Sequence, residues 1–90
     1  MAYTHGMNVE VVRQIGRDLK AEAANIGTVI HRVDGLVANS SANWHGKDAT
    51  TFAGWWQQQH RPNLVQLQSH LDGLGKAALA NAEEQEIASA

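Results

Sequence analysis

The sequence predicts an all-α fold, in which two helices form an antiparallel hairpin and two hairpins pair as a dimeric four-helix bundle. Apolar residues recur every seven positions over two stretches of about 30 residues each, as they do on one face of a helix. A short polar segment with a glycine separates the stretches, and short connections join antiparallel helices. No segment sustains the two-residue alternation that is typical of a strand.

The first helix is expected over about residues 8–38, where three adjacent columns of residues spaced seven apart are mostly apolar. The columns are Val12, Leu19, Ile26, Val33; Ile15, Glu22, Val29, Leu36; and Gly16, Ala23, Ile30, Val37. Three columns make a stripe that is wider than a two-stranded coiled-coil seam and typical of a bundle helix. Glu22 is the only charged residue among them, and we expect it at the edge of the stripe with its carboxylate in solvent.

The turn is expected over about residues 39–47, because the short polar side chains of residues 39–43 compete with the helical backbone for hydrogen bonds. Trp44-His45-Gly46 follows at the tip. We expect Trp44 to cap the end of the core and Gly46 to permit either the positive φ or the close approach needed to enter the next helix. Asp48 then serves as the N-cap or as an acidic residue of the first turn.

The second helix is expected over about residues 48–80, followed by a flexible tail over about 81–90 that is rich in acidic residues. Its seam is Phe52, Trp56, His60, Leu64, Leu67, Leu71, Leu74 and Ala78. The first three steps are four residues long, a spacing that locally unwinds a supercoil. Pro62 lies in this transition and cannot donate to the carbonyl of Gln58, so we expect a kink there. The alternative is that Pro62 starts a separate third helix.

A lone hairpin covers only part of stripes this wide, and glycines within both helices weaken them by about 1 kcal/mol each relative to alanine. We therefore expect a second hairpin to complete a four-helix bundle. The residues expected at the bundle interface are Ile15, Leu19, Ile26, Ile30, Val33, Phe52, Trp56, Leu64, Leu67, Leu71 and Leu74.

Composition argues against several classes of function. The 90 residues include no cysteine, seven basic and nine acidic residues, so we expect no disulfide, no thiolate chemistry and no nucleic-acid binding. No histidine pair has the spacing of helical metal ligands, and no nucleophile or phosphate loop stands on a rigid element. We therefore expect no enzyme, no metal site and no cofactor. The longest apolar run has four residues, so we expect no stable membrane insertion, and the first residues lack the features of a cleaved signal peptide.

Three tryptophans lie within thirteen residues: Trp44, Trp55 and Trp56. Trp56 falls on the seam and is expected in the core. Trp55 points about 100° away, so it either pads the flank of the hairpin or is exposed as a docking anchor for a partner.

This arrangement resembles the WXG family, the small ESAT-like helical hairpins that serve as substrates and adaptors of type VII secretion. The resemblance rests on Trp44-His45-Gly46 between two amphipathic helices, on Phe52-x-x-x-Trp56, and on the closing pattern Leu71-x-x-Leu74-x-x-x-Ala78-x-x-Asn81-x-x-x-Gln85. It implies a homodimeric or heterodimeric bundle, made in the cytoplasm and exported folded, without a cleaved leader, by the type VII secretion ATPase. The implied partner is a second copy, a paralogous WXG hairpin or the WXG-like domain of a larger effector or toxin.

The sequence departs from the family at the C-terminal export signal, a tyrosine followed four positions later by an acidic residue. Asn81 and Gln85 hold the matching positions, and Tyr3 is the only tyrosine. Either a partner supplies the signal or the chain uses another C-terminal pattern. Two other functions compete: an intracellular helical scaffold that is not exported, and a membrane-active amphipathic protein. The weak net charge and the lack of a lysine-rich face disfavour the second of these.

Overall fold

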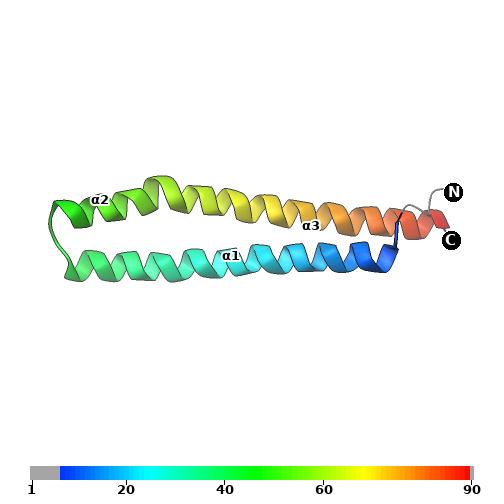
Figure 1. The fold of residues 1–90 in the computed structure, drawn as a ribbon, viewed down its shortest axis with the longest axis horizontal. Helices are drawn as coiled ribbons and strands as arrows, with labels where there is room; N and C mark the ends of the chain where they lie inside the picture. The colour runs from blue at the N-terminus through cyan, green and yellow to red at the C-terminus, as the bar shows by residue number, and fades with distance from the viewer. Residues whose placement is uncertain (1–6, 90) are drawn as a thin grey trace.

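The computed structural model describes residues 7–89, which form two long antiparallel rods (Figure 1). The first rod is helix α1 (Val9–Asn43). The second is continuous and consists of α2 (Lys47–Trp55), a π-helical turn η2 (Trp56–His60) and α3 (Arg61–Ser89). The Cα atoms span 65 × 16 × 13 Å. The predicted all-α two-helix hairpin is confirmed, and residues 7–89 contain no strand. None of their helices is both long and apolar enough to cross a membrane.

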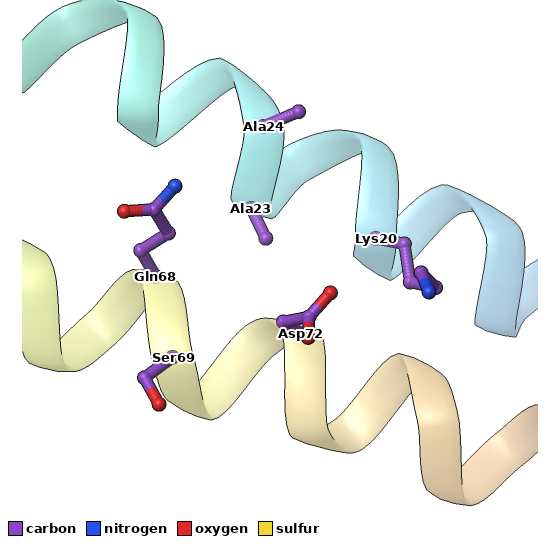
Figure 2. Close-up of a pocket in the computed structure, with 6 residues that line it drawn as sticks. All are labelled: Lys20, Ala23, Ala24, Gln68, Ser69 and Asp72. Atoms are coloured by element: carbon purple, nitrogen blue, oxygen red, sulfur yellow. The ribbon is translucent and has the colours of Figure 1, made fainter. Parts of the chain in front are cut away.

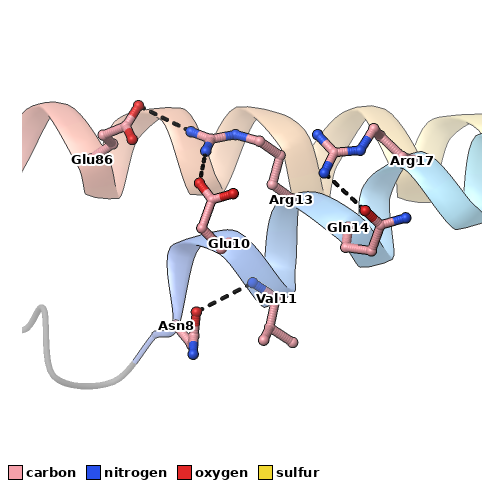
Figure 3. Close-up of polar contacts among 7 residues, drawn as sticks. All are labelled: Asn8, Glu10, Val11, Arg13, Gln14, Arg17 and Glu86. Atoms are coloured by element: carbon pink, nitrogen blue, oxygen red, sulfur yellow. Dashed lines mark hydrogen bonds and ion pairs between the residues drawn. The ribbon is translucent and has the colours of Figure 1, made fainter.

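Helix α1 begins and ends through local side-chain hydrogen bonds. At its start, Asn8 accepts a hydrogen bond from the backbone N–H of Val11 over 3.2 Å (Figure 3). At its end, the Asn43 amide donates to the carbonyl of Asn39 over 2.9 Å, and the Trp44 N–H donates to the carbonyl of Ser40 over 2.8 Å. Because the polar run satisfies these groups within the helix, α1 continues to residue 43 rather than ending near 38. The expected turn over 39–47 shrinks to residues 44–46.

Gly46 makes the entry into α2 possible. Its φ is 114°, a value that residues with a Cβ rarely adopt, and a Cβ there would meet open space, so the positive φ and not a close approach is the reason for the glycine. The Gly46 carbonyl accepts both the backbone N–H and the hydroxyl of Thr50, over 3.1 and 3.2 Å. Gly46 is therefore the N-cap residue, and Asp48 lies in the first turn, where its charge favours the positive end of the helix dipole.

The sequence predicted a kink at Pro62. The irregularity in the structure is the π-helical turn η2, which ends just before Arg61 and Pro62. The Arg61 N–H donates to the carbonyl of Trp56, five residues back. A π turn inserts one residue into the helical repeat, which fits the run of four-residue steps in the seam. The chain stays helical through Pro62, so a separate third helix does not form.

The expected flexible tail over 81–90 is wrong for the described part of the chain, since α3 continues to Ser89. Three observations explain why this segment is ordered as a helix. Ala82 is completely buried, Gln85 is half-buried, and Arg13 of α1 pairs with Glu86 over 3.0 Å (Figure 3). These contacts hold the end of α3 against the start of α1.

The core changes in thickness along the hairpin. Towards the tip, Ile30, Val37 and Trp56 form a buried cluster. Towards the open end, the two backbones meet: a Cβ on Gly16 would lie 2.8 Å from Cγ of Leu79 and 3.0 Å from the carbonyl oxygen of Gly75. The column of α1 that faces the other rod is therefore Gly16, Ala23, Ile30 and Val37.

Candidate interaction surface

One long side of the hairpin is polar. Arg13 and Glu86 pair across it, and a groove of about 370 Å³ lies further along between α1 and α3 (Figure 2). Lys20 from α1 and Asp72 from α3 line this groove, and Asp72 also pairs with Lys76 of its own helix over 3.1 Å. The small side chain of Ala23 leaves the space open. We call this the polar side.

The opposite long side is apolar and exposed. Ile15 directly precedes the buried Gly16, and Leu74 directly precedes the buried Gly75, so each is turned about 100° from the contact between the rods and away from the polar groove. The exposed residues of this apolar side are Ile15, Val29 and Leu36 on α1 and Leu67 and Leu74 on α3, with exposed fractions of 45–65%. Half-buried residues form its floor: Leu19, Ile26, Val33, Leu64 and Leu71. Exposed apolar side chains that recur along both rods make this side the candidate interaction surface.

Aromatic residues extend the apolar side to the tip. Trp44 is 46% exposed, and its ring centroid lies 5.7 Å from that of Phe52. Trp44 is therefore only partly covered and packs on Phe52, and its role as a cap on the core stays a prediction. Trp55 is also exposed, which leaves its predicted role as a docking anchor open. An apolar cleft of about 290 Å³ lies beside these rings, lined by Val33, Val37, Phe52, Trp55, Trp56 and His60.

Asp34 joins the two rods next to this cleft. Its carboxylate accepts a hydrogen bond from the indole Nε1 of Trp56 over 2.8 Å. It also accepts two parallel bonds from Arg61, Nε to Oδ1 over 2.9 Å and Nη2 to Oδ2 over 3.0 Å. These bonds, first those of Arg61 and then that of Trp56, hold the pKa of Asp34 below its usual value. Asp34 thus fixes both ends of the π-helical turn to α1.

The family model described as "Proteins of 100 residues with WXG" (WXG100) matches residues 6–86. The match covers the Trp44-His45-Gly46 turn and nearly all of both rods. This chain belongs to the WXG100 family. WXG100 proteins are small helical proteins of type VII secretion, not enzymes, and they typically pair with themselves or with paralogues. Comparisons with curated proteins and with solved structures give no match.

The residues predicted for the bundle interface of this WXG100 chain fall into three groups. Ile30 and Trp56 are buried within the hairpin itself. Leu19, Ile26, Val33, Leu64 and Leu71 are half-buried. Ile15, Phe52, Leu67 and Leu74 are exposed. The first group serves the core of the single chain, and the last group is free to contact a partner.

The end of α3 lies at the open end of the hairpin, away from the turn that joins α1 to α2 (Figure 1). The two positions that match the family's export signal are in this last part of α3. Asn81 is exposed, and Gln85 is half-buried and donates to the hydroxyl of Ser89 over 3.3 Å. Tyr3 and His5 lie outside the described residues. Within residues 7–89, no group of three or more histidine or acidic side chains could hold a metal ion.

Sequence reasoning missed Asp34 and Arg61. One signal could have found them: a buried indole N–H needs an acceptor, and Trp56 was expected in the core. Asp34 lies beside the buried column of α1, where an acceptor could reach the other rod. The register between the rods, which the sequence does not give, decides that Asp34 is the residue in reach.

Proposed function

We propose that this WXG100 chain is a non-enzymatic substrate or adaptor of type VII secretion that docks with a second helical hairpin through its apolar side. The complex is a four-helix bundle, exported without a cleaved signal peptide by the type VII secretion ATPase. The second hairpin is either another small WXG100 chain or the WXG-like domain of a larger effector or toxin, which this chain would then target for export.

The exposed apolar side is the observation that carries this proposal. Leu67, Leu74, Val29 and Leu36 each expose 45–65% of their surface in the single chain. Burial of such side chains contributes roughly 25 cal/mol for each Å² of apolar surface removed from water. A second amphipathic hairpin offers a matching surface, because its two helices also carry an apolar stripe along their length.

The experiment compares two aspartate variants in the organism that produces the protein. Leu67 and Val65 are 45% and 42% exposed, but Val65 is turned towards the polar side. Leu67→Asp places a charge in the proposed interface and should abolish both bundle formation and export. Val65→Asp should leave both near wild-type levels. Assembly is read by light scattering, and export by the protein in the medium with and without a functional type VII ATPase. Equal export of the two variants, or export independent of the ATPase, would contradict the proposal.

A further inference from the structure

We infer that Asp34 is a positioning residue for the docking surface, because it holds the extra residue of the π-helical turn that sets Trp55 in line with Leu74. The inference rests on the proposed function, since it concerns the surface that docks with a second hairpin. It adds the residue of α1 that aligns the two halves of the second rod. The spacing of buried residues, the hydrogen bonds of Asp34 and the exposure of Trp55 support it.

The buried residues of the second rod show that one residue is absorbed between its two halves. Trp56 and Gly75 both face α1, and Gly75 is nineteen positions after Trp56. In an uninterrupted α-helix, residues nineteen apart point about 100° away from each other, whereas residues eighteen apart complete about five turns and share a face. Trp56 and Gly75 therefore face the same rod because the π-helical turn takes up one residue.

The same extra residue places Trp55 on the apolar side. Trp55 directly precedes the buried Trp56. Leu74 directly precedes the buried Gly75 in the same way, so the two exposed side chains lie on one side of the rod. Trp55 accordingly lines the apolar cleft together with Val33 of α1. Without the extra residue, Trp55 would be turned about 100° out of line with Leu74, and the apolar side would lose a ring that is 58% exposed.

Asp34 joins two positions that an uninterrupted α-helix would separate. Its carboxylate accepts hydrogen bonds from Trp56, which begins the π-helical turn, and from Arg61, which follows it. Residues five apart point about 140° away from each other in an α-helix, and only about 40° once one intervening residue is absorbed. The π-helical turn therefore brings both side chains to the face where one carboxylate of α1 can bond to them.

Burial of Trp56 does not by itself fix where the extra residue lies. A buried Trp56 requires only that one residue be absorbed somewhere before Gly75, and Leu67 lies within that interval. If the residue were absorbed after Leu67, this side chain would be out of line with the other exposed residues of the apolar side. Because Asp34 also bonds to Arg61, the residue is absorbed before Arg61, and Leu67 stays on the apolar side.

Nuclear magnetic resonance tests the role of Asp34 directly. The Arg61 N–H donates to the Trp56 carbonyl in the π-helical turn, so scalar coupling across this hydrogen bond, from the Arg61 nitrogen to the Trp56 carbonyl carbon, reports the turn. The coupling should be present in the wild type and lost in Asp34→Ala. Asp18→Ala is the matched control, because Asp18 is an exposed acid of α1 that accepts a hydrogen bond from Gln14 of the same helix, and it should keep the coupling. A folded Asp34→Ala chain that keeps the coupling would overturn the inference.

Deletion of Gln58 provides the second test, since it removes one residue from the π-helical turn. Trp55 and Leu74 are then eighteen positions apart, so an uninterrupted α-helix keeps them on one side without Asp34. Asp34→Ala alone should lower export in the producing organism, and Asp34→Ala with Gln58 deleted should restore it. If Asp34→Ala unfolds, the deletion should restore its helical circular dichroism as well. An ion pair that serves stability alone would be missed equally in both chains, so equal losses with and without Gln58 would contradict the positioning role.

The outcomes separate this inference from the proposed function. Leu67→Asp with wild-type export would remove the proposed function, whatever the coupling shows, because the coupling depends on the fold of this chain and not on a partner. Loss of the coupling in Asp34→Ala with assembly and export at wild-type levels would show that Asp34 holds the turn without positioning a docking surface. That result would overturn the inference and leave the proposed function intact.

Discussion

Replacement of Gly75 by alanine should leave the hairpin no more stable than wild type or destabilise it, whereas the same change at Gly73, on the same helix, should stabilise it. A Cβ on Gly75 would lie 2.8 Å from the carbonyl oxygen of Gly16 and 2.6 Å from Cγ of Lys20. The Lys20 side chain can move aside, but the carbonyl belongs to the backbone of α1, so the two rods must separate. Nothing lies within 4 Å of a Cβ placed on Gly73.

The size of the effect follows from two opposing terms. Alanine in place of glycine stabilises a helix interior by about 1 kcal/mol, and Gly73→Ala should keep all of this gain. Overpacking of a close contact costs typically about 1–3 kcal/mol, so Gly75→Ala should range from neutral to about 2 kcal/mol less stable than wild type. The two variants should therefore differ by about 1–3 kcal/mol, or at least roughly 5 °C in Tm for a domain of this size.

Thermal and urea unfolding, followed by helical circular dichroism, measure this difference. All proteins are compared at one concentration, because assembly makes apparent stability depend on concentration. Gly35→Ala, where a Cβ also meets open space, is a second control and should behave like Gly73→Ala. Equal stabilisation by Gly73→Ala and Gly75→Ala would refute the close approach of α1 and α3.

Two further predictions concern the half of the hairpin that is nearer the turn. Asp34→Asn should lower the Tm at neutral pH, since it removes the charged partner of Arg61. Because the folded pKa of Asp34 is lowered, its ionised form stabilises the fold fully above its ordinary pKa of about 3.9 and loses this effect as pH falls through the lowered value. The Tm gap between wild type and Asp34→Asn should thus stay constant down to about pH 4 and close below it; a gap that closes near pH 6 would contradict the ion pair. Trp44→Ala should cost less than the roughly 3–5 kcal/mol typical of a fully buried tryptophan, because Trp44 is 46% exposed. If the tip also takes part in recognition, Trp44→Ala combined with Gly73→Ala should be as stable as wild type yet poorly exported, and normal export would reduce Trp44 to a packing residue.

The sequence by itself determined the two helical stretches, the hairpin and the place of the turn between them. Seven-residue recurrence of apolar side chains requires helices, and only a glycine such as Gly46 readily supplies the positive φ between them. It also marked Trp56 as a core residue and predicted an irregularity at Pro62, close to which the π-helical turn lies. All of these follow from local geometry or from the periodicity of a single helix.

The tertiary structure alone decided which part of each stripe faces inward. Three adjacent apolar columns on α1 show where the stripe lies but not which column meets the other rod. The column with Gly16 and Ala23 does so, because small residues let the backbones approach, and the larger Ile15 is turned outward. The exposed apolar side is the consequence, so the part of the predicted interface that is free for a partner could not be read from the pattern.

Contacts between distant residues also needed the tertiary structure. Asp34 meets Arg61, and Arg13 meets Glu86, at sequence separations of 27 and 73 residues. The register of the rods sets these pairs, and that register depends on the length of the turn and on the extra residue of the π-helical turn. The same long-range contacts hold the end of α3 in place, whereas its local sequence, rich in acidic residues, predicted a loose tail. The periodicity of a sequence shows which side chains share a face of one helix. The register of one helix along another is set only by how the two pack together.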